Sequence, residues 1–207
     1  MVDLCELIER IKKNLRSRPY TSALRSPFKV LVSALISART KDEVTERASR
    51  NLFKFVKKPE DLVRMSVGEI AELIYPAGFY RNKARKLKKL AEILVKKYGG
   101  KVPGSMEELL ALPGVGRKTA NLVLISMGKN TIAVDTHVHR IANRLGLVRT
   151  SKPEETEREL KRVVPKRCWR EINRVLVPFG KEICTPLKPK CDICPLRDLC
   201  PTAQNQI

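Results

Sequence analysis

The sequence predicts an all-α protein. Hydrophobic residues recur at helical spacing nearly throughout, and no convincing run alternates apolar and polar residues as a half-buried strand would. Helix start and stop signals recur at intervals suited to helices of about 8 to 17 residues joined by short turns. With 207 residues, 43% of them hydrophobic, the chain can bury a core without disulfide bonds, and a largely disordered protein is excluded.

The helix signals can be placed in chain order. Pro27 and Pro153 stand where a first helical turn would begin. Three Ser/Thr-x-x-Glu sequences predict helix starts, because the hydroxyl caps a backbone N–H and the Glu reaches back; they are Thr40–Glu43, Ser66–Glu69 and Ser105–Glu108. Glycine and proline stops are expected at Pro59, Pro76–Gly78, Gly99–Gly100, Gly128, Pro165 and Pro178–Gly180.

Residues 81–97 show the clearest helical pattern. Their apolar stripe consists of Ala84, Leu87, Leu90, Ala91 and Leu94. Basic residues are interleaved with this stripe, namely Lys83, Arg85, Lys86, Lys88 and Lys89.

The charge balance narrows the function. The chain has 42 Lys+Arg and 22 Asp+Glu, a formal net charge of +20, which implies a polyanionic partner. Nucleic acid is the first candidate and an anionic membrane surface the second, while a solvated lysine-rich surface would also carry this charge. Aromatic residues make up only 5%, which disfavours a stacking platform for single strands.

Neither a membrane span nor an export signal is expected. The longest apolar runs, such as Val30–Val32 and Leu122–Ile125, fall far short of the ~20 residues of a span. The N-terminus has an acidic residue early and no long apolar core. The expectation is an intracellular, cytoplasmic protein without a membrane partner, associated with the nucleoid in a prokaryote.

A glycine-rich turn between two helical patterns is the first candidate site. It consists of Leu112, Pro113, Gly114, Val115, Gly116, Arg117, Lys118, Thr119 and Ala120. Two glycines two residues apart permit a tight turn with positive φ, and backbone N–H groups at the start of the second helix can bind a phosphate. The spacing is not that of a Walker loop. An ordinary corner between two helices is the alternative.

Asp135 is the second candidate. It ends an apolar run and precedes the helical pattern from His137 to Leu145. An aspartate in this position is a good N-cap. A functional role is compatible with capping, because a cap holds the carboxylate ionised and fixed.

Four of the six cysteines form the third candidate. Cys184, Cys191, Cys194 and Cys200 follow a C-x6-C-x2-C-x5-C spacing with helix-breaking prolines between them, which suits a four-coordinate metal centre or a cluster. Two disulfides or unlinked thiols are the alternatives. Cys5 and Cys168 stand alone and are expected to be small core residues.

With these features in chain order, the sequence resembles the endonuclease III family of DNA glycosylases, the helix–hairpin–helix enzymes of base excision repair. The resemblance rests on LPGVGRKTAN (112–121), TIAVDTHVHR (131–140) and the cysteine spacing, with weaker similarity in LISARTKD (35–42), GFYRNKA (78–84) and the helix after Pro153. It implies a six-helix domain over 20–131 that contains the hairpin. Residues 1–19 with 132–207 would form an iron–sulfur domain, and DNA would bind across the cleft between the two.

The resemblance also implies the chemistry. Lys118 would attack the sugar C1′ and form a Schiff base, which permits β-elimination and a nick 3′ to the lesion. Asp135 would lie close by and accept a proton or stabilise positive charge on the sugar. A phosphate-binding lysine on a binding-only hairpin is the alternative for Lys118. Adenine and thymine-mismatch glycosylases generally lack lysine at this position, so lysine favours the bifunctional glycosylase/lyase branch.

Cofactor and DNA contacts follow from the same resemblance. Cys184, Cys191, Cys194 and Cys200 match the ligands of the family's [4Fe–4S] cluster. The DNA-binding residues would be Arg39, Phe79, the hairpin residues Leu112, Pro113, Gly114, Val115, Gly116 and Arg117, together with His137, Lys188 and Lys190. Lys188 and Lys190 would face phosphates. Arg39 stands where glutamine is usual and would face the base orphaned by extrusion of its partner. Phe79 stands where leucine is common and would wedge the opposite strand. His137 is a candidate pocket residue, and His139 is expected at the surface or as a cap.

The predicted function is therefore that of a monomeric DNA glycosylase with AP-lyase activity. It would remove oxidised pyrimidines from double-stranded DNA that contains damaged bases or abasic sites. A uracil, thymine-mismatch or purine-lesion glycosylase on the same scaffold is one alternative. A non-catalytic DNA-binding or electron-transfer iron–sulfur module is the other.

Overall fold

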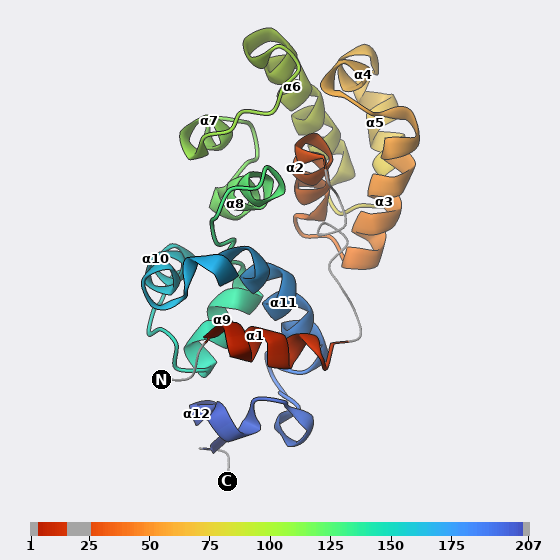
Figure 1. The fold of residues 1–207 in the computed structure, drawn as a ribbon. Coiled ribbons are helices and arrows are strands. Elements are labelled where there is room, and N and C mark those ends of the chain that lie inside the picture. Colours follow the sequence, from red (N-terminus) through yellow and green to blue (C-terminus); the bar gives the residue numbers. More distant parts are fainter. Residues whose placement is uncertain (1–3, 16–25, 205–207) are drawn as a thin grey trace. The chain divides into compact units, whose positions relative to one another are not determined.

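The computed structural model describes residues 4–15 and 26–204, and within these ranges the regular elements are helices without strands, which confirms the all-α prediction. The chain divides into two compact units, Ala23–Lys129 and Met1–Ser22 with Asn130–Ile207, called here the central unit and the terminal unit. Each is described by itself (Figure 1).

The central unit is built from the helices α2 (Pro27–Ser37), α3 (Asp42–Phe55), α4 (Pro59–Arg64), α5 (Val67–Ile74), α6 (Tyr80–Tyr98), α7 (Met106–Leu110) and α8 (Arg117–Ser126). The terminal unit contains α1 (Leu4–Lys12), α9 (Thr136–Arg144), α10 (Pro153–Val163), α11 (Trp169–Glu182) and α12 (Pro201–Gln204), with the 3₁₀ turns η2 (Lys166–Cys168), η3 (Cys191–Ile193) and η4 (Arg197–Leu199).

Helix α2 forms the middle of the central unit. It is apolar around most of its circumference, and it packs against α3, α6 and α8. A helix that is hydrophobic on several faces is stable only when neighbours cover those faces. Ser26 caps its first turn by accepting a hydrogen bond from Lys29 N, and Pro27 begins the helix as predicted.

Helix α6 bears out the stripe predicted for residues 81–97. Its five predicted apolar residues, Ala84, Leu87, Leu90, Ala91 and Leu94, are all fully buried. One of the interleaved lysines, Lys83, is also buried. The helix ends where the two glycines were expected to stop it, with Gly99 in the left-handed region at φ 58°.

Two of the three predicted N-caps are confirmed. Ser66 accepts a hydrogen bond from Glu69 N, and Ser105 accepts one from Glu108 N. The prediction for Thr40 is wrong, because α3 begins at Asp42 and its cap residue is Lys41. The hydroxyl of Thr40 instead contacts the segment 78–83, which no local pattern in the sequence could have indicated.

The expected stop at Pro178–Gly180 is also wrong, because α11 continues through Pro178 to Glu182. A proline inside a helix costs about 3 kcal/mol. Its burial with the neighbouring Val177 and Phe179 offsets that cost. A Cβ on Gly180 would lie 2.8 Å from His137 Nδ1, so this glycine allows α9 to pack closely on α11.

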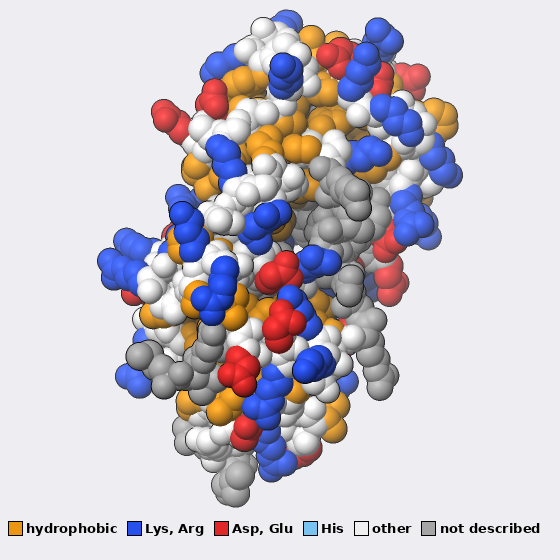
Figure 2. Space-filling model, viewed as in Figure 1, with side chains coloured by type: hydrophobic (Ala, Val, Ile, Leu, Met, Phe, Trp, Pro, Cys, Tyr) orange, Lys and Arg blue, Asp and Glu red, His pale blue; other side chains and the backbone are white. Residues whose placement is uncertain are grey.

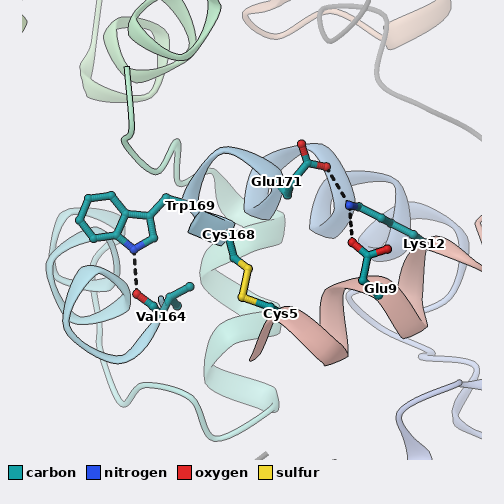
Figure 3. The surroundings of a disulfide bond; sticks show 7 residues. All are labelled: Cys5, Glu9, Lys12, Val164, Cys168, Trp169 and Glu171. Carbon is teal, nitrogen blue, oxygen red and sulfur yellow. Dashed lines mark hydrogen bonds and ion pairs between the residues drawn. A yellow bond between two sulfur atoms is a disulfide. The ribbon is translucent and has the colours of Figure 1, made fainter. Parts of the chain in front are cut away.

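Helix α1 belongs to the terminal unit, although it lies at the other end of the chain from α11. Its buried residues Leu4, Leu7, Ile8 and Ile11 join the core formed by α9, α10 and α11. A disulfide between Cys5 and Cys168 ties α1 to η2, and Lys12 makes ion pairs with Glu9 and Glu171 (Figure 3). The expectation that the two cysteines stand alone is therefore wrong. They are 163 residues apart in the sequence, so only the packing of α1 brings them together.

Candidate functional site

The glycine-rich turn lies between α7 and α8 and is anchored by apolar side chains. Leu112 and Val115 are buried, and Val115 N donates to Leu112 O at 3.2 Å, which closes the turn. Gly114 has a φ of +80°, and a Cβ there would lie 2.9 Å from Leu35 Cδ2. Only glycine combines this backbone conformation with so close a neighbour.

Gly116 has a different role from Gly114. It is the N-cap residue of α8 with extended backbone, φ −100° and ψ 176°, so the expected positive φ applies to the first glycine alone. A Cβ on Gly116 would meet no atom within 4 Å. The space beside the N-terminus of α8 is therefore open, and the partial positive charge of a helix N-terminus favours an anion there.

Lys118 is the second residue of α8 and is exposed, as is Arg117 before it. Pro113, on the other side of the turn, is half-buried. The turn therefore presents two basic side chains beside an open helix N-terminus. This arrangement suits contact with a phosphate.

Asp135 is the N-cap of α9 in the terminal unit. Its Oδ1 accepts hydrogen bonds from His137 N at 3.0 Å and from Val138 N at 2.9 Å. The capping geometry inferred from the sequence is thus confirmed, and it fixes the direction of the carboxylate. Asp135 is half-buried.

Arg140 connects the helix behind Asp135 to the loop that carries the cysteines. Its NH2 group donates to Gly180 O at 3.0 Å and to Cys184 O at 2.8 Å, and it lies 3.3 Å from His137 Nδ1. His137 is thereby held against α11. His139, expected at the surface or as a cap, instead lies 2.6 Å from Thr156 Oγ1 and links α9 to α10.

The four predicted ligands lie around one open cavity. Cys184 follows α11, Cys191 begins η3, Cys194 follows η3 and Cys200 follows η4, and all four line the same pocket. All four are free thiols, so the alternative of two disulfides among them is wrong. Arg144 holds the loop from the helix side, with its NH1 group 3.5 Å from Cys184 Sγ and 2.7 Å from Thr185 O.

The donor set fits an iron–sulfur cluster. Burial raises the pKa of the thiols of Cys191 and Cys194, and the neighbouring cysteines raise both further. Four thiolates so close together are stable only beside a cationic centre. The four thiols line one pocket, and four cysteines are the usual ligands of an iron–sulfur cluster.

The predicted phosphate contacts Lys188 and Lys190 are exposed on the loop between Cys184 and Cys191. Leu187, which directly precedes Lys188 in the sequence, is 95% exposed. Lys and Arg side chains are spread over the visible face of each unit, with fewer Asp and Glu among them (Figure 2). These features match the polyanionic partner inferred from the charge balance.

Arg39 and Phe79 are brought together within the central unit. Both are exposed, and the guanidinium of Arg39 lies 5.8 Å from the centroid of the Phe79 ring. The hairpin with Lys118 also belongs to the central unit, whereas Asp135, His137 and the cysteines belong to the terminal unit.

Sequence reasoning missed the contacts made by Thr40, Lys83, Arg140 and Arg144. A signal for Arg140 and Arg144 was available, because residues four apart on a helix lie on the same face and can contact the same neighbouring segment.

Two family models match the chain. One is described as an HhH-GPD superfamily base excision DNA repair protein and matches residues 32–166. The other is the iron–sulfur binding domain of endonuclease III and matches residues 184–200. Together they include the hairpin, Asp135 and the four cysteines.

Known relatives are similar over most of the chain. Endonuclease III of Thermotoga maritima is 47% identical over 94% of this chain and 92% of its own length. Endonuclease III of Bacillus subtilis is 40% identical over 87% and 84%, respectively. The endonuclease III-like protein 1 of Gallus gallus is 44% identical over 86% of this chain, but the chain spans only 65% of that longer protein.

Solved structures give the same result. A non-covalent endonuclease III–DNA complex is 34% identical with a TM-score of 0.88, covering 100% of this chain and 99% of that one. A trapped endonuclease III–DNA covalent intermediate matches with a TM-score of 0.87 over the same shares. A thermostable thymine-DNA glycosylase is 28% identical with a TM-score of 0.85, covering 96% and 94%.

Proposed function

The chain belongs to the endonuclease III family of base excision repair enzymes, and from this premise we propose that it is a DNA glycosylase/AP lyase whose nucleophile is Lys118. The substrate is double-stranded DNA that contains an oxidised pyrimidine or an abasic site, and the enzyme acts as a monomer. The observation that carries the proposal is the exposed Lys118 at the first turn of α8, directly after the open glycine turn.

Lys118 supplies the electron pair for the first step. Its neutral amine attacks C1′ of the sugar, the bond from C1′ to the base breaks, and the base departs with that electron pair and takes up a proton. Nζ then loses a proton, the bond from C1′ to O4′ breaks and O4′ takes up a proton, which leaves a Schiff base between Lys118 Nζ and C1′. Loss of a C2′ proton then expels the 3′ phosphate by β-elimination, and water releases the lysine. Among the similar structures, the trapped covalent intermediate of endonuclease III with DNA supports this route.

Asp135 has a capped carboxylate that accepts a proton during these steps or stabilises the positive charge that develops on the sugar. Its two backbone hydrogen bonds hold the carboxylate in one orientation, so little reorganisation is needed when the charge develops. We assign to His137, which Arg140 holds in place, a contact with the extruded base. Glycosylases reach the bond between base and sugar only after the target base has left the base stack.

The four cysteines hold the [4Fe–4S] cluster that the family carries. When bound, the cluster would cross-link the loop 184–200 through these cysteines. The loop presents Lys188 and Lys190 to the DNA backbone, and the glycine turn presents the N-terminus of α8 to another phosphate. These contacts position the duplex without reading its sequence.

Borohydride trapping tests the nucleophile. Borohydride reduces the Schiff base to a stable amine, so enzyme and DNA become covalently linked. We expect the wild type to be trapped on duplexes with thymine glycol or an abasic site, and the variant Lys118→Gln to bind the same DNA without being trapped. Lys101→Gln, which replaces an exposed lysine outside the site, is the matched control and should be trapped like the wild type. Trapping of Lys118→Gln would refute the assignment.

A second candidate function is removal of thymine from mismatches, because a thymine-DNA glycosylase shares the fold at 28% identity. Single-turnover base release from thymine glycol, uracil and G·T duplexes separates the two. Faster release from the G·T duplex than from thymine glycol would favour the second candidate.

A further inference from the structure

Two exposed side chains of the central unit lie on strained backbone. Arg39 has a φ of 52° and Phe79 a φ of 56°, and these are the non-glycine residues with positive φ in the part of the chain that the structure describes. Residues with bulky side chains rarely have a positive φ, and this backbone conformation persists only where surrounding contacts enforce it. Phe79 is 62% exposed, so its side chain gains little from burial. Something else must hold both residues in place.

Thr40 and Lys83 provide the contacts that fix the two segments. The hydroxyl of Thr40 accepts a hydrogen bond from Gly78 N at 3.0 Å and another from Lys83 Nζ at 2.6 Å. Lys83 Nζ also donates to Ile36 O at 2.6 Å, in the last turn of α2. A Cβ on Gly78 would lie 2.5 Å from Arg39 O, so the two backbones touch at this point. These bonds act directly beside Arg39 and Phe79.

Burial of the Lys83 amine costs desolvation free energy, so we expect a function that retains a lysine at this position. Lys83 is 7% exposed, and burial lowers its pKa to about 8. Its Nζ donates to two acceptors, Ile36 O and Thr40 Oγ1, and these two hydrogen bonds offset part of the cost of burial. Apolar residues could fill the same space more cheaply, but they could not hold both segments by hydrogen bonds.

We propose that Lys83 and Thr40 are positioning residues that lock Arg39 and Phe79 into one rigid wedge, which fills the gap in duplex DNA when the target base is extruded. The inference rests on the proposed function. Because the wedge is assembled before DNA arrives, little conformational entropy is lost when it enters the base stack. The wedge would contact the unpaired base opposite the lesion and the base-pair step next to it.

A second lysine on the same helix offers a matched control. Lys88 Nζ donates to Val63 O and Met65 O and is also partly buried, but it lies away from the two strained loops. The variants Lys83→Met and Lys88→Met therefore remove the same kind of contact from α6. Only the first affects the segments that carry Arg39 and Phe79.

The test measures wedge insertion directly. A duplex carries a tetrahydrofuran abasic analogue opposite 2-aminopurine, whose fluorescence reports unstacking of the orphaned base. We expect Lys83→Met to lose this signal and to release thymine glycol from duplex DNA about 10- to 100-fold more slowly than the wild type. Trapping on an abasic site in single-stranded DNA, which has no opposite strand, should stay within about twofold and shows that the variant is folded. Lys88→Met should match the wild type in all three assays.

A pair of substitutions at Thr40 gives an independent answer without removing the lysine. Thr40→Val removes the hydroxyl and should lose the fluorescence signal, whereas Thr40→Ser keeps it and should restore the signal. Equal signals from these two variants, or from the two lysine variants, would overturn the inference. If instead the wild type neither releases base nor is trapped, the proposed function fails while the fluorescence result stands by itself.

Discussion

Asp135 has two roles that substitutions can separate. Its carboxylate caps α9 through the backbone N–H groups of His137 and Val138, and we assign the same carboxylate to the chemistry. Asparagine is as good an N-cap as aspartate but carries no charge. Alanine removes both the cap and the charge. The variants Asp135→Asn and Asp135→Ala should therefore differ in stability but not in activity.

The expected magnitudes follow from the capping geometry. Loss of an N-cap costs about 0.5–2 kcal/mol, and two well-placed hydrogen bonds put Asp135→Ala at about 1–2 kcal/mol. Asp135→Asn loses only the interaction of a charge with the helix dipole, about 0.3–1 kcal/mol. For a chain of this size, each kcal/mol lowers Tm by about 2–4 °C. Base release should slow by about 10²- to 10⁴-fold in both variants.

Thermal unfolding and single-turnover release of thymine glycol measure the two effects on the same preparations. Ser66→Ala removes a comparable cap in the central unit, where Ser66 accepts from Glu69 N, and it should lose stability without losing activity. An Asp135→Asn enzyme with wild-type base release would refute the catalytic role. An Asp135→Ala enzyme as stable as Asp135→Asn would refute the capping argument.

Three further predictions concern the phosphate contacts, the buried amine of Lys83 and the cluster ligands. DNA affinity should fall linearly with salt on a log–log plot, and Lys188→Gln should reduce the slope by about 0.9 if that lysine contacts one phosphate. Because Lys83 releases its proton at about pH 8 when folded but near pH 10.5 when unfolded, the stability of the wild type relative to Lys83→Met should rise between these pH values, by up to about 3 kcal/mol; a flat difference contradicts burial of the amine. Cys194→Ser should lower the iron content and weaken DNA binding while the overall helix content measured by circular dichroism stays unchanged; full iron occupancy would exclude Cys194 as a ligand.

Features that depend on neighbours in the chain were readable from the sequence. The stripe of α6, the caps at Ser66 and Ser105 and the prolines that begin α2 and α10 all follow from contacts within a few residues. The same holds for the cysteine spacing, because the loop between Cys184 and Cys200 is short enough to bring the four thiols around one cavity. The glycine turn was readable because the positive φ of Gly114 admits few other residues.

Features that depend on distant segments were decided by tertiary packing alone. Thr40 has the sequence pattern of a cap, yet its hydroxyl bonds to Gly78 and Lys83, about forty residues away. Lys83 reads as one more surface lysine of α6 until α2 presents the carbonyl of Ile36 to it. Cys5 meets Cys168 only because α1 packs on α11. A local pattern fixes which way a side chain leaves its helix, but only the packed fold decides which distant group it meets, and that is why the helices and the candidate chemistry were in the sequence while the contacts that position them were not.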